Sequence, residues 1–271
     1  MNEKCHRKFC GIFVCVSLQK SILENEGYIF GIRPVIEAIN AGREIDGLMI
    51  QQGLRSDAYN ELRELMRIHR IECRFVPIQK LNRITRKNHQ GVIAWISEIS
   101  YHEIENLVPT LFEEGKTPLL LVLDRVTDVR NFGAIARTAE CAGVHAIIIP
   151  LQNSVRVSAD AIKSSAGALN IIPVCRSKNL KATLQYLKQS GIQLTGCTEK
   201  TSKNYYDASF TMPMAIIMGS EEDGISPAYL DMTDEQLKIE MAGTIASLNV
   251  SVAAGIILFE AHRQRVAENI R

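Results

Sequence analysis

The chain contains 271 residues, of which 46% are hydrophobic and 23% charged, and its formal net charge is +1. This composition is that of an ordinary globular protein, and the length suits one large domain or two small ones. Bulk charge alone gives no sign of a polyanionic partner. No apolar stretch is long enough to cross a membrane, which argues against a membrane-spanning protein.

Residues 1–26 predict a disordered extension outside the folded domains. Cys5, Cys10 and Cys15 lie here with His6 between them, but their spacing is loose for zinc and no second half of a site follows. The apolar run 11–18 is short for a signal peptide, and no cleavage site follows it. The seven cysteines include no C-x-x-C pair, which favours free thiols in a reducing cytoplasm. We therefore expect a cytoplasmic protein without a metal.

Residues 27–100 predict a small α/β domain. The pattern gives a strand and helix over 28–42, a strand over 47–51, a helix over 57–70 and strands over 72–78 and 91–99. Between Arg55 and Lys87 there are nine basic and four acidic residues, a local excess of 9 − 4 = +5. Such a segment can follow a phosphate backbone, or it can be a solvated helix face.

Residues 101–117 predict a linker, and residues 118–271 a second domain in which strands and helices alternate. Strands are predicted over 119–124, 145–150, 171–175, 192–198, 214–219 and 236–241, and helices over 131–143, 158–169, 179–191 and 247–268. Nearly continuous apolar strands between helices indicate a parallel sheet covered on both faces. Ligands bind such sheets at the carboxyl ends of the strands, so the residues after Asp124, Met218 and Met241 are candidate site residues.

The first candidate motif follows the strand that ends at Asp124. Asn131 and Gly133 open a helix, and Arg137 lies nearly two turns further along. A helix N-terminus together with an arginine can bind a phosphate or a ribose. Alternatively, Asn131 is a simple helix cap and Arg137 a partner in a surface ion pair.

Two further motifs follow later strands. In "IIMGSEEDGIS", Gly219 and Gly224 let the backbone approach a ligand closely and Glu221 lies between them, although a plain turn with solvated acids fits too. In "MAGTIASLN", small and polar residues precede the last helix, which is also compatible with a polar helix start capped by Ser247. Three such loops on one sheet indicate a single pocket for a nucleotide-like ligand. No G-x-G-x-x-G motif occurs.

The stretches "NFGAIARTAECAG", "IIMGSEEDGIS" and "IEMAGTIASLNVSVAAG" resemble, in order and spacing, the three motifs of the SpoU/TrmH family of RNA ribose 2′-O-methyltransferases. The upstream unit with "RITRKNHQGVIA" resembles the small substrate-binding domain of this family, which is similar to ribosomal protein folds. The resemblance covers residues 28–271. It implies an α/β fold whose C-terminal parallel-sheet domain forms a deep trefoil knot (SPOUT-type), a homodimer, and S-adenosylmethionine bent among the knot loops.

The resemblance also implies roles for individual residues. Arg137 takes the position that activates the ribose hydroxyl; because arginine is normally always charged, we expect it to stabilise a developing alkoxide and not to act as a base. The other catalytic candidates are Asn131, Glu221, Ser247 and Asn249. The cofactor-binding candidates are Gly219, Ile239, Met241, Leu248 and Thr198, with small residues at Gly219, Gly243 and Ser247 allowing close backbone approach. The RNA-binding candidates are Arg83, Arg86, Lys87 and His89, although His89 can equally serve domain folding.

The chain departs from the family at one position: Glu240 stands where the family often has a proline, which can leave this loop less rigid. The main functional hypothesis is methylation of a guanosine ribose in 23S ribosomal RNA. The alternatives are methylation of transfer RNA, a non-catalytic RNA-binding or ribosome-assembly factor, and a small-molecule α/β enzyme. The last would leave the N-terminal unit without a role.

Overall fold

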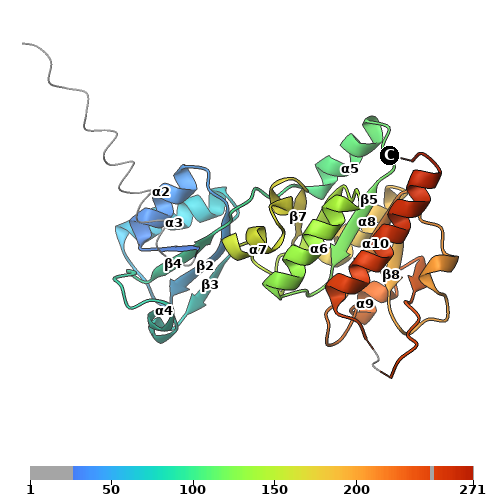
Figure 1. Cartoon of the computed structure of the whole chain (residues 1–271). Coiled ribbons are helices and arrows are strands. Elements are labelled where there is room, and N and C mark those ends of the chain that lie inside the picture. Colours follow the sequence, from blue (N-terminus) through green and yellow to red (C-terminus); the bar gives the residue numbers. More distant parts are fainter. Residues whose placement is uncertain (1–26, 245–246, 271) are drawn as a thin grey trace, which may run out of the picture. The chain divides into compact units, whose positions relative to one another are not determined.

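The computed structural model describes residues 27–244 and 247–270, so the extension predicted over 1–26 lies outside the described part. The chain divides into two compact units, which meet in sequence between Glu98 and Ile99 (Figure 1). No helix of the described residues is long and apolar enough to cross a membrane.

The N-terminal unit is a four-stranded sheet with helices on both faces. The strand order is β1-β4-β2-β3, and only β2 and β3 run parallel. One face packs against α2 and α3 through buried Val35, Ile50 and Leu62, and the other against α4 through Leu81. Its elements are β1 (Tyr28–Phe30), α2 (Ile32–Asn40), β2 (Ile45–Gln51), α3 (Asp57–Ile68), β3 (Cys73–Val76), α4 (Ile78–Ile84) and β4 (Val92–Ile96).

Helix α4 was not predicted from the sequence. The segment 72–78 looked like one strand, but β3 ends at Val76 and Pro77 precedes the first turn of the helix. Proline fits a helix start because its fixed φ is already helical and its missing N–H is not needed there. The helix carries Lys80 and Arg83, so part of the predicted basic segment is a helix face.

The C-terminal unit confirms the predicted parallel sheet. Its strand order is β10-β8-β9-β5-β6-β7, and every neighbouring pair is parallel. The elements are α5 (Ile104–Glu113), β5 (Leu119–Leu123), α6 (Val129–Cys141), β6 (Ala146–Pro150), α7 (Ala159–Ser164), η1 (Ala168–Asn170), β7 (Val174–Ser177), α8 (Leu180–Gln189), β8 (Gln193–Cys197), η2 (Tyr205–Asp207), β9 (Met214–Met218), α9 (Pro227–Leu230), β10 (Glu235–Leu237) and α10 (Val250–Ala267).

Alternate residues of each central strand face two separate apolar layers. Leu119, Leu121 and Leu123 of β5 pack under α6 and α10, which lie side by side in Figure 1. Leu120 and Val122 pack on the opposite face, under α5 and α8. Because both faces are buried, β5, β6 and β9 are apolar at every position, as the sequence predicted. The trefoil knot implied by the resemblance stays a prediction.

A helix occupies the segment that we expected to be a linker. Within 101–117, α5 buries Ile104, Val108 and Leu111 against the C-terminal sheet. The polar run that suggested a linker covers only the end of this helix and the following turn at Gly115, while the apolar face at i, i+4 and i+7 is characteristic of an amphipathic helix. The expected linker is therefore wrong: α5 is part of the C-terminal unit.

A buried arginine joins the final helix, α10, to the segments that precede β5 and β9. Arg265 is 6% exposed, and its guanidinium donates to the carbonyl oxygens of Thr117 (2.6 Å), Met212 (2.8 Å), Phe210 (2.9 Å) and Pro118 (3.2 Å). Burial lowers the pKa of Arg265 to about 10. Four carbonyl acceptors compensate for the loss of water around this charge.

Candidate active site

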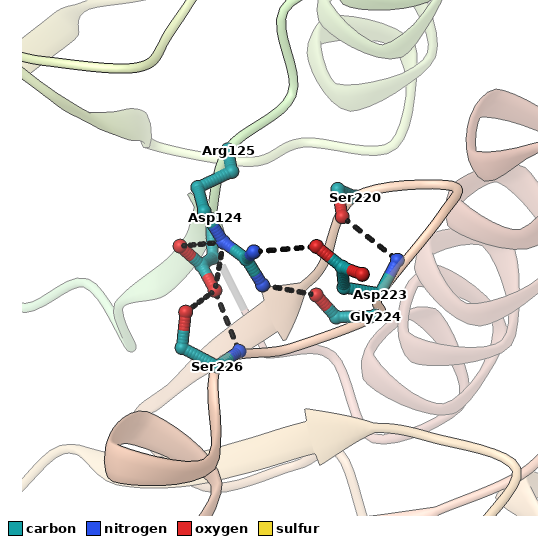
Figure 2. A network of polar contacts seen from close by, with 6 residues as sticks. All are labelled: Asp124, Arg125, Ser220, Asp223, Gly224 and Ser226. Carbon is teal, nitrogen blue, oxygen red and sulfur yellow. Dashed lines mark hydrogen bonds and ion pairs between the residues drawn. The ribbon is translucent and has the colours of Figure 1, made fainter.

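Asp124 is the first polar residue after β5, and it fastens the loop that follows β9. Its carboxylate is 2% exposed. Oδ2 accepts hydrogen bonds from the backbone N of Ser226 at 2.7 Å and from the Ser226 hydroxyl at 2.6 Å (Figure 2). The strand ends therefore meet at the carboxyl edge of the sheet, as the parallel order requires.

Arg125 holds the same loop from its other side. Its φ of 58° turns the chain sharply after the strand. The guanidinium donates to Asp223 Oδ2 at 2.9 Å and to the carbonyl of Gly224 at 3.1 Å (Figure 2). Sequence analysis missed Arg125, Asp223 and Ser226; two charged residues directly after a fully apolar strand were the available signal.

The loop 220–226 also closes on itself. Ser220 and Gly224 exchange backbone hydrogen bonds of 3.2 and 3.0 Å. A Cβ added to Gly219 would lie 2.0 Å from the carbonyl carbon of Gly224 and 2.1 Å from the N of Ile225. Gly219 must therefore be small because the loop's own backbone crosses it. This packing is a different reason from the close cofactor approach that we expected.

One predicted residue from each of the three motifs meets in a single polar cluster. Glu221 Oε1 accepts hydrogen bonds from the side-chain amides of Asn131 (3.0 Å) and Asn249 (2.7 Å). Asn249 also donates to Asn131 Oδ1 at 3.0 Å. The two amides and the carboxylate come from positions up to 118 residues apart, so the fold brings them together. We call these three residues the polar cluster.

The caps of the two flanking helices differ from the alternatives that the sequence left open. Asp128, not Asn131, caps α6, and its carboxylate accepts from the Asn131 N at 2.8 Å. Asn249, not Ser247, caps α10, which begins at Val250, and its Oδ1 accepts from the Ser251 N at 2.9 Å. Both Asn side chains therefore keep their amide N–H groups directed into the cluster.

Arg137 is exposed on α6, two turns from the start of the helix. Among the described residues it forms no hydrogen bond or ion pair, so the surface ion pair considered as an alternative is absent there. The structure does not join Arg137 to the polar cluster. Its guanidinium is available to a charged ligand.

The predicted cofactor residues lie around the segment between β10 and α10. Thr198 directly follows β8 and donates its backbone N–H to the carbonyl of Leu237 at 2.8 Å. Ile239 packs against the main core, Leu248 is half-buried, and Met241 is 37% exposed. Ser247 is exposed, and a Cβ on Gly243 would meet nothing within 4 Å. The strand predicted over 236–241 is shorter: β10 ends at Leu237.

The predicted RNA-binding residues fall into two groups. Arg83, Arg86 and Lys87 are exposed on the N-terminal unit, and the Lys87 ammonium lies 5.8 Å from the centre of the Phe30 ring. His89 is 6% exposed; its Nε2 lies 2.8 Å from Asn82 Oδ1, and its Nδ1 accepts from the Gly91 N at 3.0 Å. With both ring nitrogens engaged inside the unit, His89 fits domain folding better than RNA contact.

The cysteine thiol at this edge of the sheet is protonated at neutral pH. Cys197 lies beside Thr198, but burial raises the pKa of its thiol to about 12, so it is not a thiolate at neutral pH. Within the described ranges, no group of three His, Cys, Asp or Glu side chains could hold a metal ion. The site consists of amides, a carboxylate, an exposed guanidinium and a loop of small residues.

These features define a class: an α/β protein with a candidate ligand site at the carboxyl edge of a parallel sheet and a second, smaller α/β unit. Comparison with known proteins makes the class specific. Residues 118–259 match the model of the SpoU rRNA methylase family, and residues 28–102 match the RNA 2′-O ribose methyltransferase substrate-binding domain.

Curated relatives and solved structures support the same family. The chain is 33% identical to YacO of Bacillus subtilis, named a TrmH family tRNA/rRNA methyltransferase, over 89% of this chain and 97% of YacO. It is 42% identical to the 23S rRNA (guanosine-2′-O-)-methyltransferase RlmB of Vibrio parahaemolyticus, over 71% and 80%. The SpoU methyltransferase AviRb of Streptomyces viridochromogenes, solved with AdoMet, superposes with a TM-score of 0.59 at 26% identity, over 93% and 98%.

The chain therefore belongs to the SpoU/TrmH family. It is an S-adenosylmethionine-dependent RNA 2′-O-methyltransferase, and RNA is its substrate.

The described residues between β10 and α10 fit a cofactor held by backbone groups. Residues Met241, Ala242, Gly243 and Thr244 are exposed, and their backbone groups form no hydrogen bonds with other described residues. Unpaired N–H and C=O groups on an exposed loop can bind a polar ligand without losing internal bonds. Ile239 and Leu248 supply apolar surface on either side of this stretch.

Proposed function

We propose that this enzyme methylates the 2′-hydroxyl of a guanosine in 23S ribosomal RNA. The observation that carries the catalytic part is the polar cluster, which joins Asn131, Glu221 and Asn249 through bonds of 2.7 to 3.0 Å. The 42% identity to a protein named as a 23S rRNA guanosine methyltransferase supports the substrate. Exposed Arg83, Arg86 and Lys87 supply a basic surface for the phosphate backbone.

The proposed site residues divide the work of an in-line displacement. When bound, S-adenosylmethionine supplies an electrophilic methyl group on a sulfonium. Glu221 is oriented through Oε1 by two amides, and its Oε2, which has no partner among the described residues, can accept a hydrogen bond from a ribose hydroxyl. Arg137 stabilises the negative charge that develops on the 2′-oxygen as its proton passes to Glu221 Oε2. Ser247 lies on the adjoining loop and helps to position the ribose.

The proposed cofactor contacts are Gly219, Ile239, Met241, Leu248 and Thr198. All five lie at the carboxyl edge of β8, β9 and β10 or on the loop that follows β10. Contacts through backbone groups tolerate Glu240 at the position where the family often has a proline, because such contacts need no particular side chain there.

We also propose a homodimer in which α10 contributes to the interface. Val252, Phe259 and Val266 repeat at intervals of seven residues on α10 and are 50%, 48% and 60% exposed. A helix that is apolar on its outer face as well as its core face needs a partner to bury the outer stripe. Light scattering on the purified chain measures the assembly directly.

The decisive experiment adds methyl-labelled S-adenosylmethionine to the protein and total RNA from cells lacking this gene, then separates the RNA by size and digests it to nucleosides. We expect label in large-subunit rRNA as 2′-O-methylguanosine. Label in transfer RNA would keep the chemistry and overturn the substrate. No label with cofactor still bound would point to an assembly-stage RNA substrate missing from the preparation or to the non-catalytic assembly factor.

The same assay tests Arg137. We expect Arg137→Ala to abolish turnover while S-adenosylmethionine still binds, because the guanidinium acts on the ribose oxygen and its loss disturbs no internal contact among the described residues. Arg130→Ala, at another exposed arginine of the same helix, is the matched control. Full activity in Arg137→Ala would remove Arg137 from the mechanism.

A further inference from the structure

The chain just before the loop 239–249 is held on one side by the segment that follows β8. Lys238 donates its backbone N–H to the carbonyl of Lys203 at 2.9 Å, and its own carbonyl accepts from the Tyr205 N at 2.9 Å. These two bonds extend the pairing of β8 with β10 beyond the regular strands, as the bridge between Asn204 and Lys238 shows. The backbone is thus fixed up to Lys238.

Side chains carry this attachment two residues further. The Tyr206 hydroxyl donates to Glu240 Oε2 at 3.1 Å, and the same hydroxyl accepts from the Asn204 amide at 2.8 Å. The Tyr206 ring lies edge-on to Tyr205, with 5.3 Å between ring centres, and Tyr205 packs against the main core. The Asn204–Tyr206–Glu240 chain therefore leads from a core-packed segment to the first exposed residue of the loop.

Beyond Glu240 the internal bonds stop. Met241 to Thr244 form no hydrogen bond with other described residues, so Glu240 is the last fastened residue before the exposed stretch. The accepting carboxylate also raises the pKa of Tyr206, as expected when a hydrogen bond stabilises the protonated phenol. A side-chain tether at this point limits the positions that Ile239 and Met241 can adopt.

We infer that the Tyr206–Glu240 hydrogen bond is a positioning device that holds the chain at Glu240, where the exposed stretch Met241–Thr244 begins. Tyr206 and Glu240 act through the loop and do not touch the reacting atoms. The inference rests on the proposed assignment of 239–248 to S-adenosylmethionine binding. The backbone N–H of Glu240 has no acceptor among the described residues, so a proline there would remove no such bond.

The test compares Tyr206→Phe with the wild-type protein by two measurements. Titration calorimetry with S-adenosylmethionine gives the Kd, and hydrogen exchange without the cofactor reports on the amides of Tyr205 and Lys238, which are hydrogen-bonded beside the start of the loop. We expect Tyr206→Phe to weaken binding about fivefold, the effect of one ordinary hydrogen bond, and to speed exchange at these two amides. Tyr229→Phe, which removes a hydroxyl from α9 outside this contact, should change neither.

Substitutions at Glu240 separate positioning from simple loss of charge. Glu240→Gln keeps an oxygen acceptor and should bind like wild type, whereas Glu240→Ala should match Tyr206→Phe. Glu240→Pro in the Tyr206→Phe background should restore binding, because the ring restrains the backbone without the tyrosine. A general loss of folding would not be rescued in this way.

The outcomes distinguish the positioning role of Tyr206 from the assignment of the cofactor site. Unchanged Kd and unchanged exchange in Tyr206→Phe would overturn the inference and leave the proposed function intact. Faster exchange with an unchanged Kd would also overturn the inference. Tyr206 would then hold the loop, but the loop would not bind the cofactor. No binding by the wild-type protein would contradict the cofactor assignment itself.

Discussion

The loops 220–226 and 239–249 follow strands of the same sheet, yet they are built in opposite ways. The first is closed by its own backbone and held by Asp124 and Arg125. The second is fastened at its ends, by Tyr206 at Glu240 and by the cap at Asn249, with exposed residues from Met241 to Thr244 between. A rigid loop suits the carboxylate of Glu221, which must point in one direction. The exposed backbone of Met241–Thr244 suits a ligand that backbone groups contact.

The glycines of the two loops should respond most differently to substitution. Gly219→Ala puts a methyl group 2.0 Å from the Gly224 carbonyl carbon, so we expect a loss of about 3 kcal/mol or more in unfolding free energy. Gly243→Ala meets nothing within 4 Å and should change stability by less than about 0.5 kcal/mol. Urea unfolding measures both. Equal stability of the two variants would contradict the comparison.

Gly243→Ala also bears on the cofactor. If the ligand approaches the backbone there, the variant should bind S-adenosylmethionine more weakly although its stability is unchanged. Unchanged binding would place the close approach at other residues of the loop.

A smaller loss is expected at Asp124, which holds the rigid loop. In Asp124→Asn, an NH2 group can take the place of the carboxylate oxygen that accepts from the Ser226 N–H and hydroxyl. Two donors would then face each other, so we expect the free energy of unfolding to fall by about 2 to 3 kcal/mol. Asp223→Asn is the control, because this carboxylate is 69% exposed and its pair with Arg125 should contribute less than about 1 kcal/mol. Thermal or urea unfolding distinguishes the two variants.

The smallest stability effect is expected at the far end of the open loop. Asn249→Ala removes the cap of α10 and should cost about 1 kcal/mol, together with activity because the polar cluster loses a donor to Glu221. Asn249→Ser keeps a capping oxygen and should recover most of the stability, but not the activity. Recovery of both would show that Asn249 serves only as a cap.

Sequence analysis predicted the parallel sheet because strand burial follows from local patterns, whereas the three residues of the polar cluster were named as catalytic candidates through the resemblance to the family motifs. It failed where the structure of a segment, or the reason for a residue, depends on contacts with distant parts of the chain. Helix α5 looked like a linker because its polar end dominated the pattern, although Ile104, Val108 and Leu111 form an apolar face. Gly219 carried a signal for small size, but only the folded loop shows that Gly224 and Ile225 are the neighbours that require it.

Side-chain partners over long distances in sequence were equally out of reach. The bond between Arg125 and Asp223 joins residues 98 apart, and nothing in either segment identifies the other. For His89 the sequence left two roles open, and burial with both ring nitrogens engaged favours folding. Arg137 was identified by resemblance to a family motif, and its exposure on α6 agrees with a role toward a ligand.

The guanidinium of Arg265 has a consequence for the order in which the protein forms during synthesis. Its acceptors include the carbonyl of Thr117, which leaves the ribosome 148 residues earlier. At ordinary translation rates of about 5 to 20 residues per second, the carbonyl of Thr117 is made about 7 to 30 s before its donor. Until then the beginnings of β5 and β9 lack the side chain that joins them to α10. The substrate-binding unit can fold before the last helix has been synthesised. The methyltransferase unit can complete its core only after that helix has emerged.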